Sequence, residues 1–139
     1  MFTGIVSALG RIVTATSLGA EDGHGMRLAV AAPAGFLDDV QPGDSIAING
    51  ACMTATAFDA ARTTFEIDIS AESLARTAGL DRPGPVNLEK AMRAHDRLGG
   101  HLVSGHIDGI GSVVHFAPDR KSTRLNSSHE RLSRMPSSA

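Results

Sequence analysis

The sequence contains no tryptophan and no tyrosine, and it has only five phenylalanines. A hydrophobic core must therefore be built from aliphatic residues and methionine. Hydrophobic residues make up 42% of the 139 positions, which is enough for one ordinary domain with something left over. No apolar run approaches the roughly 18 residues of a membrane-spanning helix, so we predict no membrane partner.

Cysteine is almost absent as well, because Cys52 is the only one. An intramolecular disulfide is excluded, and a lone thiol favours a cytoplasmic protein. The N-terminal stretch MFTGIVSALGRIV has no basic leader and no convincing cleavage site, so we expect no signal peptide.

The formal net charge of −2 conceals an asymmetry. Residues 1–119 hold 8 lysines and arginines against 14 acidic residues, whereas residues 120–139 hold 5 against 1. The acidic body argues against a nucleic-acid partner.

Alternating and punctuated segments predict an all-β domain. Residues 65–70 (FEIDIS) alternate apolar and polar side chains, and residues 26–33 and 44–50 do so more weakly. Turn sequences such as QPGD (41–44) and NG (49–50) separate these segments, which is typical of a small barrel or sandwich.

Two short segments have helical character. Residues 33–40 (PAGFLDDV) predict one or two turns, and residues 70–79 predict a helix with Ser70 as N-cap and Gly79 as its stop.

Beyond Phe116 the sequence loses its apolar periodicity and becomes rich in serine, arginine and asparagine. A disordered basic tail and an arm for nucleic acid or membrane are two interpretations. We favour a third, in which residues 118–139 are a non-native tail joined to a truncated gene.

The start of the chain recurs near position 102. Residues 1–13 (MFTGIVSALGRIV) align with residues 102–114 (LVSGHIDGIGSVV), an offset of 101 residues. Such an offset predicts a second copy of a unit of about 100 residues, of which this chain holds only the beginning.

Four motifs carry a family resemblance: MFTGIV (1–6), NGACMTATAF (49–58), NLEKAMR (87–93) and DRLGGHLVSGHIDGIG (96–111). Together they resemble the alpha-chain type of riboflavin synthase from Met1 to about Phe116. The resemblance implies two six-stranded Greek-key β-barrels that bind lumazine, followed by a helix that drives trimerisation. It predicts a first barrel over residues 1–99, a truncated second repeat over 100–117 and a tail over 118–139.

The resemblance also implies a reaction. Two molecules of 6,7-dimethyl-8-ribityllumazine dismutate to riboflavin and 5-amino-6-ribitylaminouracil, and because donor and acceptor are the same compound, no cofactor and no metal is expected. In the family the active site forms between barrels of neighbouring subunits. The truncated chain is therefore expected to bind ligand with little turnover and to form a homodimer.

The resemblance assigns catalytic roles to Phe2, Cys52, His101 and His106. Phe2 would offer a flat apolar face to the heterocycle, and Cys52 either a polar contact or a weak nucleophile. A histidine can accept a proton near neutral pH, and His106, in the SGH motif, has the better case than His101. A metal site at these histidines fails for lack of further ligands.

The implied substrate-binding residues lie in four segments whose backbone or polar side chains would contact the heterocycle and the ribityl hydroxyls. They are Gly4, Ile5 and Val6; Ser45, Cys52, Met53 and Thr54; Asp68, Ile69, Ser70, Ala71, Glu72 and Ser73; and Gly105, His106 and Ile107.

Each assignment has a structural alternative: a core phenylalanine, a buried thiol, a helix cap at Ser70 or a surface histidine at His101. A non-catalytic lumazine- or flavin-binding carrier built on the same barrel is the alternative function.

Overall fold

The computed structural model describes residues 1–19, 24–118 and 123–127. These residues belong to two units, Met1–Asp108 and the chain from Gly109 onward. The first unit contains six strands and one short helix among its described residues: β1 Ala8–Ser17, β2 Met26–Ala31, β3 Ser45–Ile48, β4 Ala51–Phe58, β5 Thr64–Ile69, α1 Ala71–Ala75 and β6 Gly84–Lys90.

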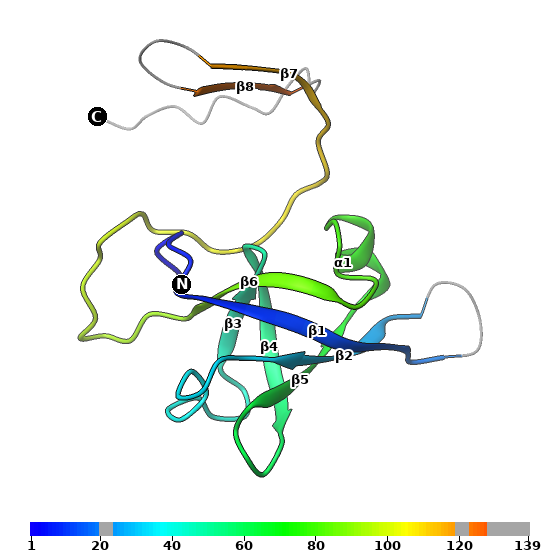
Figure 1. The fold of residues 1–139 in the computed structure, drawn as a ribbon, viewed down its shortest axis with the longest axis vertical. Helices are drawn as coiled ribbons and strands as arrows, with labels where there is room; N and C mark the ends of the chain where they lie inside the picture. The colour runs from blue at the N-terminus through cyan, green and yellow to red at the C-terminus, as the bar shows by residue number, and fades with distance from the viewer. Residues whose placement is uncertain (20–23, 119–122, 128–139) are drawn as a thin grey trace. The chain divides into compact units, whose positions relative to one another are not determined.

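The six strands form a closed antiparallel barrel in the order β1-β2-β5-β4-β3-β6 (Figure 1). Strands β3, β4 and β5 follow one another as neighbours, whereas β2 pairs with β5 and β6 pairs with both β3 and β1. These long-range pairings are Greek-key connections. The predicted all-β, six-stranded Greek-key barrel is confirmed.

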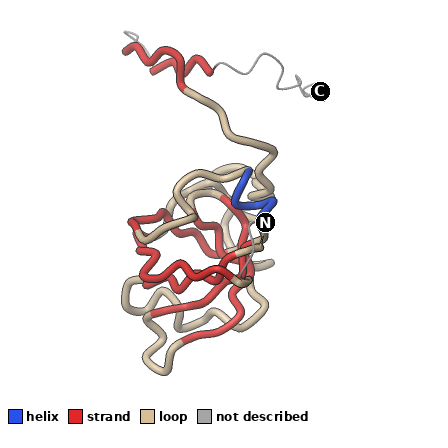
Figure 2. The backbone as a smooth tube through the Cα atoms, turned by 90° about the vertical axis from the view of Figure 1, so that its right-hand side faces the viewer, coloured by secondary structure: helices blue, strands red, loops and turns tan. Residues whose placement is uncertain are grey.

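Side-chain alternation explains why these segments line a barrel. Phe65, Ile67 and Ile69 of β5 are at most 1% exposed, and they lie opposite Val30, Leu28 and Met26 of β2. The intervening polar residues face outward, as the period of two along a strand requires. The tubes of Figure 2 show that strands make up most of the barrel wall.

The turn between β3 and β4 is the predicted Asn-Gly turn. Asn49 and Gly50 both have positive φ, 49° and 84°, which is the backbone of a two-residue type I′ hairpin loop. The side chain of Asn49 accepts a hydrogen bond from the Asn87 N–H at 2.8 Å, so the turn is also tied to β6.

The helical predictions are confirmed at one segment and wrong at the other. Ser70 caps α1 by accepting from the Ser73 N–H at 3.1 Å, although the helix ends at Ala75, before Gly79. Residues 33–40 form successive turns closed by bonds three residues apart, such as Val40 N to Leu37 O at 3.2 Å. Gly35, at φ 81°, interrupts any regular helix there.

The segment that follows β6 is tied back to the start of the chain. Phe2 and Val103 exchange two backbone hydrogen bonds, of 2.8 and 3.0 Å, and the His101 N–H donates to the Thr3 carbonyl at 2.8 Å. Residues 100–108, expected to begin a second repeat, therefore pack as part of the first unit.

The second unit contains a two-stranded antiparallel sheet of β7 (Val113–Pro118) and β8 (Thr123–Ser127). Strand β8 lies within the range expected to be a non-native tail. The rest of that range, apart from Pro118, lies outside the described residues.

Candidate functional site

Two cavities of the described barrel residues concern the site, and the smaller of the two brings together three segments that are far apart in the sequence. Its volume is about 220 Å³. It is lined from β4, from α1 and the residues after it, and from the segment after Val103, namely by Ala51, Cys52, Met53, Glu72, Ser73, Arg76, Thr77, Gly105, His106 and Ile107.

One wall of this cavity forms where the backbone of β4 lies close to the backbone of residues 105–107. The Cys52 N–H donates to the Gly105 carbonyl at 2.8 Å. Gly105 has φ 75°, and a Cβ at this position would lie 3.0 Å from both the nitrogen and the Cβ of Cys52. Glycine is required here for its left-handed backbone and for the lack of space. The following residues, His106 and Ile107, are thereby held on the cavity.

The polar part of the cavity lining comes from α1 and the residues after it. Glu72 and Arg76 form an ion pair of 2.7 Å, and the Thr77 hydroxyl donates to the Ser73 carbonyl at 2.8 Å. The sequence reasoning included Glu72 and Ser73 but missed Arg76, Thr77 and also Ala51 of β4. The four-residue spacing of Arg76 from Glu72, and of Thr77 from Ser73, is the signal that would have found the first two.

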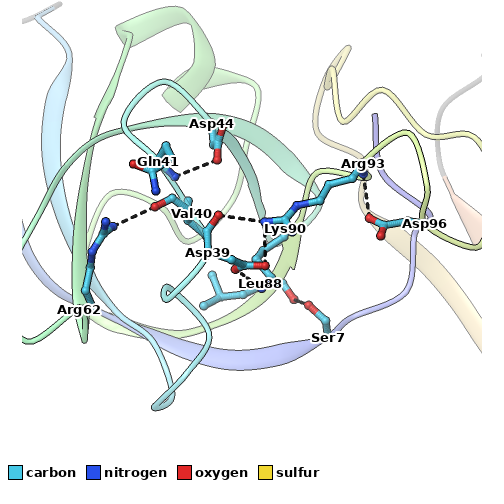
Figure 3. Close-up of polar contacts among 10 residues, drawn as sticks. All are labelled: Ser7, Asp39, Val40, Gln41, Asp44, Arg62, Leu88, Lys90, Arg93 and Asp96. Carbon is cyan, nitrogen blue, oxygen red and sulfur yellow. Dashed lines mark hydrogen bonds and ion pairs between the residues drawn. The ribbon is translucent and has the colours of Figure 1, made fainter.

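The larger cavity, of about 620 Å³, lies beside the end of β6 and includes residues from the N-terminal segment. The Asp39 carboxylate forms ion pairs with Lys90 at 2.7 Å and with Arg93 at 2.8 Å (Figure 3). The hydrogen bond from Lys90, aided by Arg93, lowers the pKa of the Asp39 carboxyl below its ordinary value. These charges largely satisfy one another.

The structure brings seven of the sequence-predicted site residues together on the smaller cavity: Cys52, Met53, Glu72, Ser73, Gly105, His106 and Ile107. Of the four residues assigned catalytic roles, Cys52 and His106 are in this group. Ile5 and Ser45 line the larger cavity instead.

The remaining predicted residues line neither of these cavities: Phe2, Gly4, Val6, Thr54, Asp68, Ile69, Ser70, Ala71 and His101. Phe2 is only 1% exposed, so its ring is covered. Asp68 points outward and takes two hydrogen bonds from Arg27, of 2.7 and 2.8 Å, which lower the pKa of its carboxyl. Its carboxylate is thus engaged on the outer face of the barrel.

Within the described ranges, no group of three histidine, cysteine, aspartate or glutamate side chains could hold a metal ion. In the same part of the chain no helix is long and apolar enough to cross a membrane.

A closed six-stranded barrel with a small cavity of mixed polarity, formed by β4, α1 and residues 105–107, has the architecture of a small ligand-binding domain. The family model described as "Lumazine binding domain" matches residues 3–91 of this sequence. The chain belongs to the lumazine-binding domain family.

Several curated proteins that are similar to this chain are riboflavin synthases. The chain is 44% identical over 123 residues to the riboflavin synthase of Meyerozyma guilliermondii, covering 86% of this chain and 52% of that protein. It is 41% identical over 116 residues to that of Bacillus subtilis, covering 82% of this chain and 51% of the relative. The chain thus spans about half the length of the curated relatives it matches.

Solved structures of LumP share the fold. The LumP structure complexed with 6,7-dimethyl-8-(1'-D-ribityl) lumazine has a TM-score of 0.69 and 24% sequence identity, covering 90% of this chain and 67% of that chain. The LumP structure complexed with riboflavin has a TM-score of 0.67 at 24% identity, covering 86% of this chain and 62% of that chain.

Proposed function

We propose that this chain is the first lumazine-binding barrel of a riboflavin synthase, and that its smaller cavity binds one molecule of 6,7-dimethyl-8-ribityllumazine. The observation that carries the proposal is the meeting of Cys52 and His106 on one cavity. These two residues come from separate family-like motifs. Identity of 41–44% to the riboflavin synthases described above supports the choice of ligand.

The cavity offers what such a ligand needs. The flat heterocycle requires apolar contact, which Met53 and Ile107 supply. The ribityl chain presents several hydroxyl groups, and Ser73, Glu72 and Arg76 offer partners for them. The Cys52 thiol adds a polar contact at the wall.

The reaction of the whole enzyme transfers a four-carbon unit between two identical molecules. The donor leaves as 5-amino-6-ribitylaminouracil and the acceptor becomes riboflavin, so atoms and electrons balance without an external oxidant. A proton must leave the C7 methyl group of one molecule, and the His106 imidazole is the acceptor we assign. The two heterocycles must also be held stacked, which is a task of proximity and orientation.

Stacking two ligands requires a second barrel facing this cavity. The chain spans only about half of its relatives, and we propose that its residues from Gly100 onward begin the second repeat while residues 118–139 do not belong to it. The barrel therefore provides half of an active site, and it should bind ligand with little or no turnover.

Self-association of the chain is the expected partner arrangement, as a homodimer in place of the family's trimer. Leu9, Val13 and Leu102 are 70%, 49% and 66% exposed, and such apolar surface favours contact with another barrel. Sedimentation at high concentration with ligand present tests this, and a profile of monomer alone contradicts it. We also propose a cytoplasmic location, on the basis of the single cysteine.

The decisive experiment is a titration with 6,7-dimethyl-8-ribityllumazine, followed by absorbance and ligand fluorescence, and then by riboflavin in the same cuvette. Saturable binding without riboflavin supports a half-site. Riboflavin formation contradicts the half-site account, and absence of binding contradicts the ligand assignment. Cys52→Ser is the diagnostic variant, since it should weaken binding without unfolding the barrel, whereas Thr54→Ser lies off the cavity and serves as control.

A further inference from the structure

The carboxylate of Glu89, next to the end of β6, accepts three hydrogen bonds from the N-terminal segment. Oε1 accepts from the Thr3 N–H at 2.5 Å and from the Thr3 hydroxyl at 2.6 Å, and Oε2 accepts from the Gly4 N–H at 3.1 Å. The Thr3 hydroxyl oxygen in turn accepts from the Ile5 N–H at 3.2 Å. Hydrogen bonds to a carboxylate are stronger than those between neutral groups.

The N-terminal segment held by Glu89 is itself paired with the chain that leads to the smaller cavity. The backbones of Phe2 and Val103 exchange two hydrogen bonds, and the His101 N–H donates to the Thr3 carbonyl. Gly100 lies so close that a Cβ there would meet the Thr3 carbonyl oxygen. Chain ends fray unless they are tied down, and here the N-terminal segment is held by the partly buried Glu89 carboxylate as well as by backbone pairing.

Two residues beyond Val103, the Gly105 carbonyl accepts from Cys52, and Gly105 to Ile107 form one wall of the cavity. The same short segment is therefore tethered at one end to the N-terminus and at the other to β4. Glu89 lies outside that cavity, among the residues that line the larger one.

We infer that Glu89 is a positioning residue for the ligand cavity. Its carboxylate holds Thr3 and Gly4, these hold residues 101–103, and the segment 105–107 is thereby presented to the ligand. The inference rests on the proposed function for its ligand, but the chain of contacts exists without ligand and can be tested without it.

The first test is amide hydrogen exchange in the ligand-free protein. In Glu89→Gln one carboxylate oxygen is replaced by an NH₂ group. This group is a donor that faces the N–H groups of the N-terminal segment, and the negative charge is lost. Exchange at Thr3, His101 and Val103 should become about tenfold faster or more, as expected for loss of a charge-assisted bond. Exchange at Leu28 in the core should not change, because the barrel itself remains folded.

The matched control is Asp44→Asn. Asp44 lines the same larger cavity and also loses one negative charge, but its carboxylate accepts from the Gln41 N–H and from nothing in the N-terminal segment among the contacts described. A second variant, Thr3→Val, removes only the hydroxyl and keeps the β-branched shape and the carboxylate. It should accelerate exchange at His101 by about threefold, and it decides the question if Glu89→Gln fails to fold.

The second test is affinity for 6,7-dimethyl-8-ribityllumazine at a temperature where every variant is fully folded. Glu89→Gln should bind about tenfold more weakly, Thr3→Val about threefold more weakly, and Asp44→Asn like wild type. Unchanged exchange at His101 and Val103, or unchanged affinity in Glu89→Gln, overturns the inference. If wild-type protein does not bind the lumazine, the proposed function fails, and the exchange measurement alone then decides whether Glu89 positions the segment.

Discussion

Replacing Gly105 by alanine perturbs the cavity at the point where two segments come closest. Gly105 has φ 75°, and its added Cβ would lie 3.0 Å from Cys52 N and Cys52 Cβ and 3.2 Å from the Gly50 carbonyl oxygen. A non-glycine residue in the left-handed region costs roughly 1–2 kcal/mol. The contacts near 3.0 Å add to that cost, because β4 and the Asn-Gly turn cannot easily move apart.

The protein can bear this strain or release it by detaching the segment, which would break the 2.8 Å hydrogen bond from Cys52 to Gly105. Breaking such a bond costs about 1 kcal/mol. If the free protein relieves the strain by detaching the segment, rebuilding the cavity wall on binding requires about 1–2 kcal/mol, so the lumazine should bind about five- to thirty-fold more weakly. The barrel strands do not include Gly105, so the unfolding midpoint should fall much less than binding does.

The assay is the fluorescence titration with 6,7-dimethyl-8-ribityllumazine, accompanied by thermal unfolding. Gly109→Ala is the control, because a Cβ at Gly109 meets nothing within 4 Å. Wild-type affinity in Gly105→Ala, with unchanged exchange of the Cys52 amide, would refute the reasoning about this wall.

Three further outcomes follow from the fold and its charges. Asp68→Asn should leave lumazine affinity within about twofold of wild type, because its carboxylate binds Arg27 on the outer face; a large loss would return Asp68 to the site. Phe65→Ala should lower the free energy of unfolding by about 3–5 kcal/mol, since this ring is fully buried; chemical denaturation measures it, and a loss under about 1 kcal/mol would mean the core collapses around the gap. The pKa of Asp39 is lower in the folded protein than its ordinary value of 3.8. Its pairing with Lys90 therefore stabilises the folded state fully at pH values above 3.8, and this stabilisation is lost as the pH falls through the lowered pKa. The free energy of unfolding of Asp39→Asn should therefore be lower than that of wild type by up to about 1 kcal/mol near neutral pH, and the difference should vanish in acid. A difference independent of pH would contradict this.

Local sequence predicted strands and tight turns because these leave short-range patterns, whereas the choice of a six-stranded barrel over a sandwich came from the family resemblance. The alternation of Phe65, Ile67 and Ile69 identified β5, and Asn49-Gly50 identified the turn that precedes β4. The same alternation already implied that Asp68, between two inward residues, faces out. The helix predicted at 33–40 was wrong because composition alone did not register the left-handed backbone of Gly35.

The family motifs predicted seven residues of the smaller cavity but not the other residues that line it. Arg76 and Thr77 were missed, although helical spacing from Glu72 and Ser73 pointed to them. Phe2 was expected to face the ligand, yet its ring is buried and its backbone pairs with Val103. Whether a side chain faces a cavity depends on what packs against it.

By itself, the sequence determined a small all-β domain of the lumazine-binding type, because alternation, turn chemistry and motif spacing are properties of neighbouring residues. Only the tertiary structure decided that Cys52 meets Gly105 and that Glu89 holds Thr3 and Gly4. These contacts join residues separated by 50 or more positions. Closing a barrel brings such positions together through strand pairing, and no local pattern in the chain records which distant groups then lie within hydrogen-bonding distance.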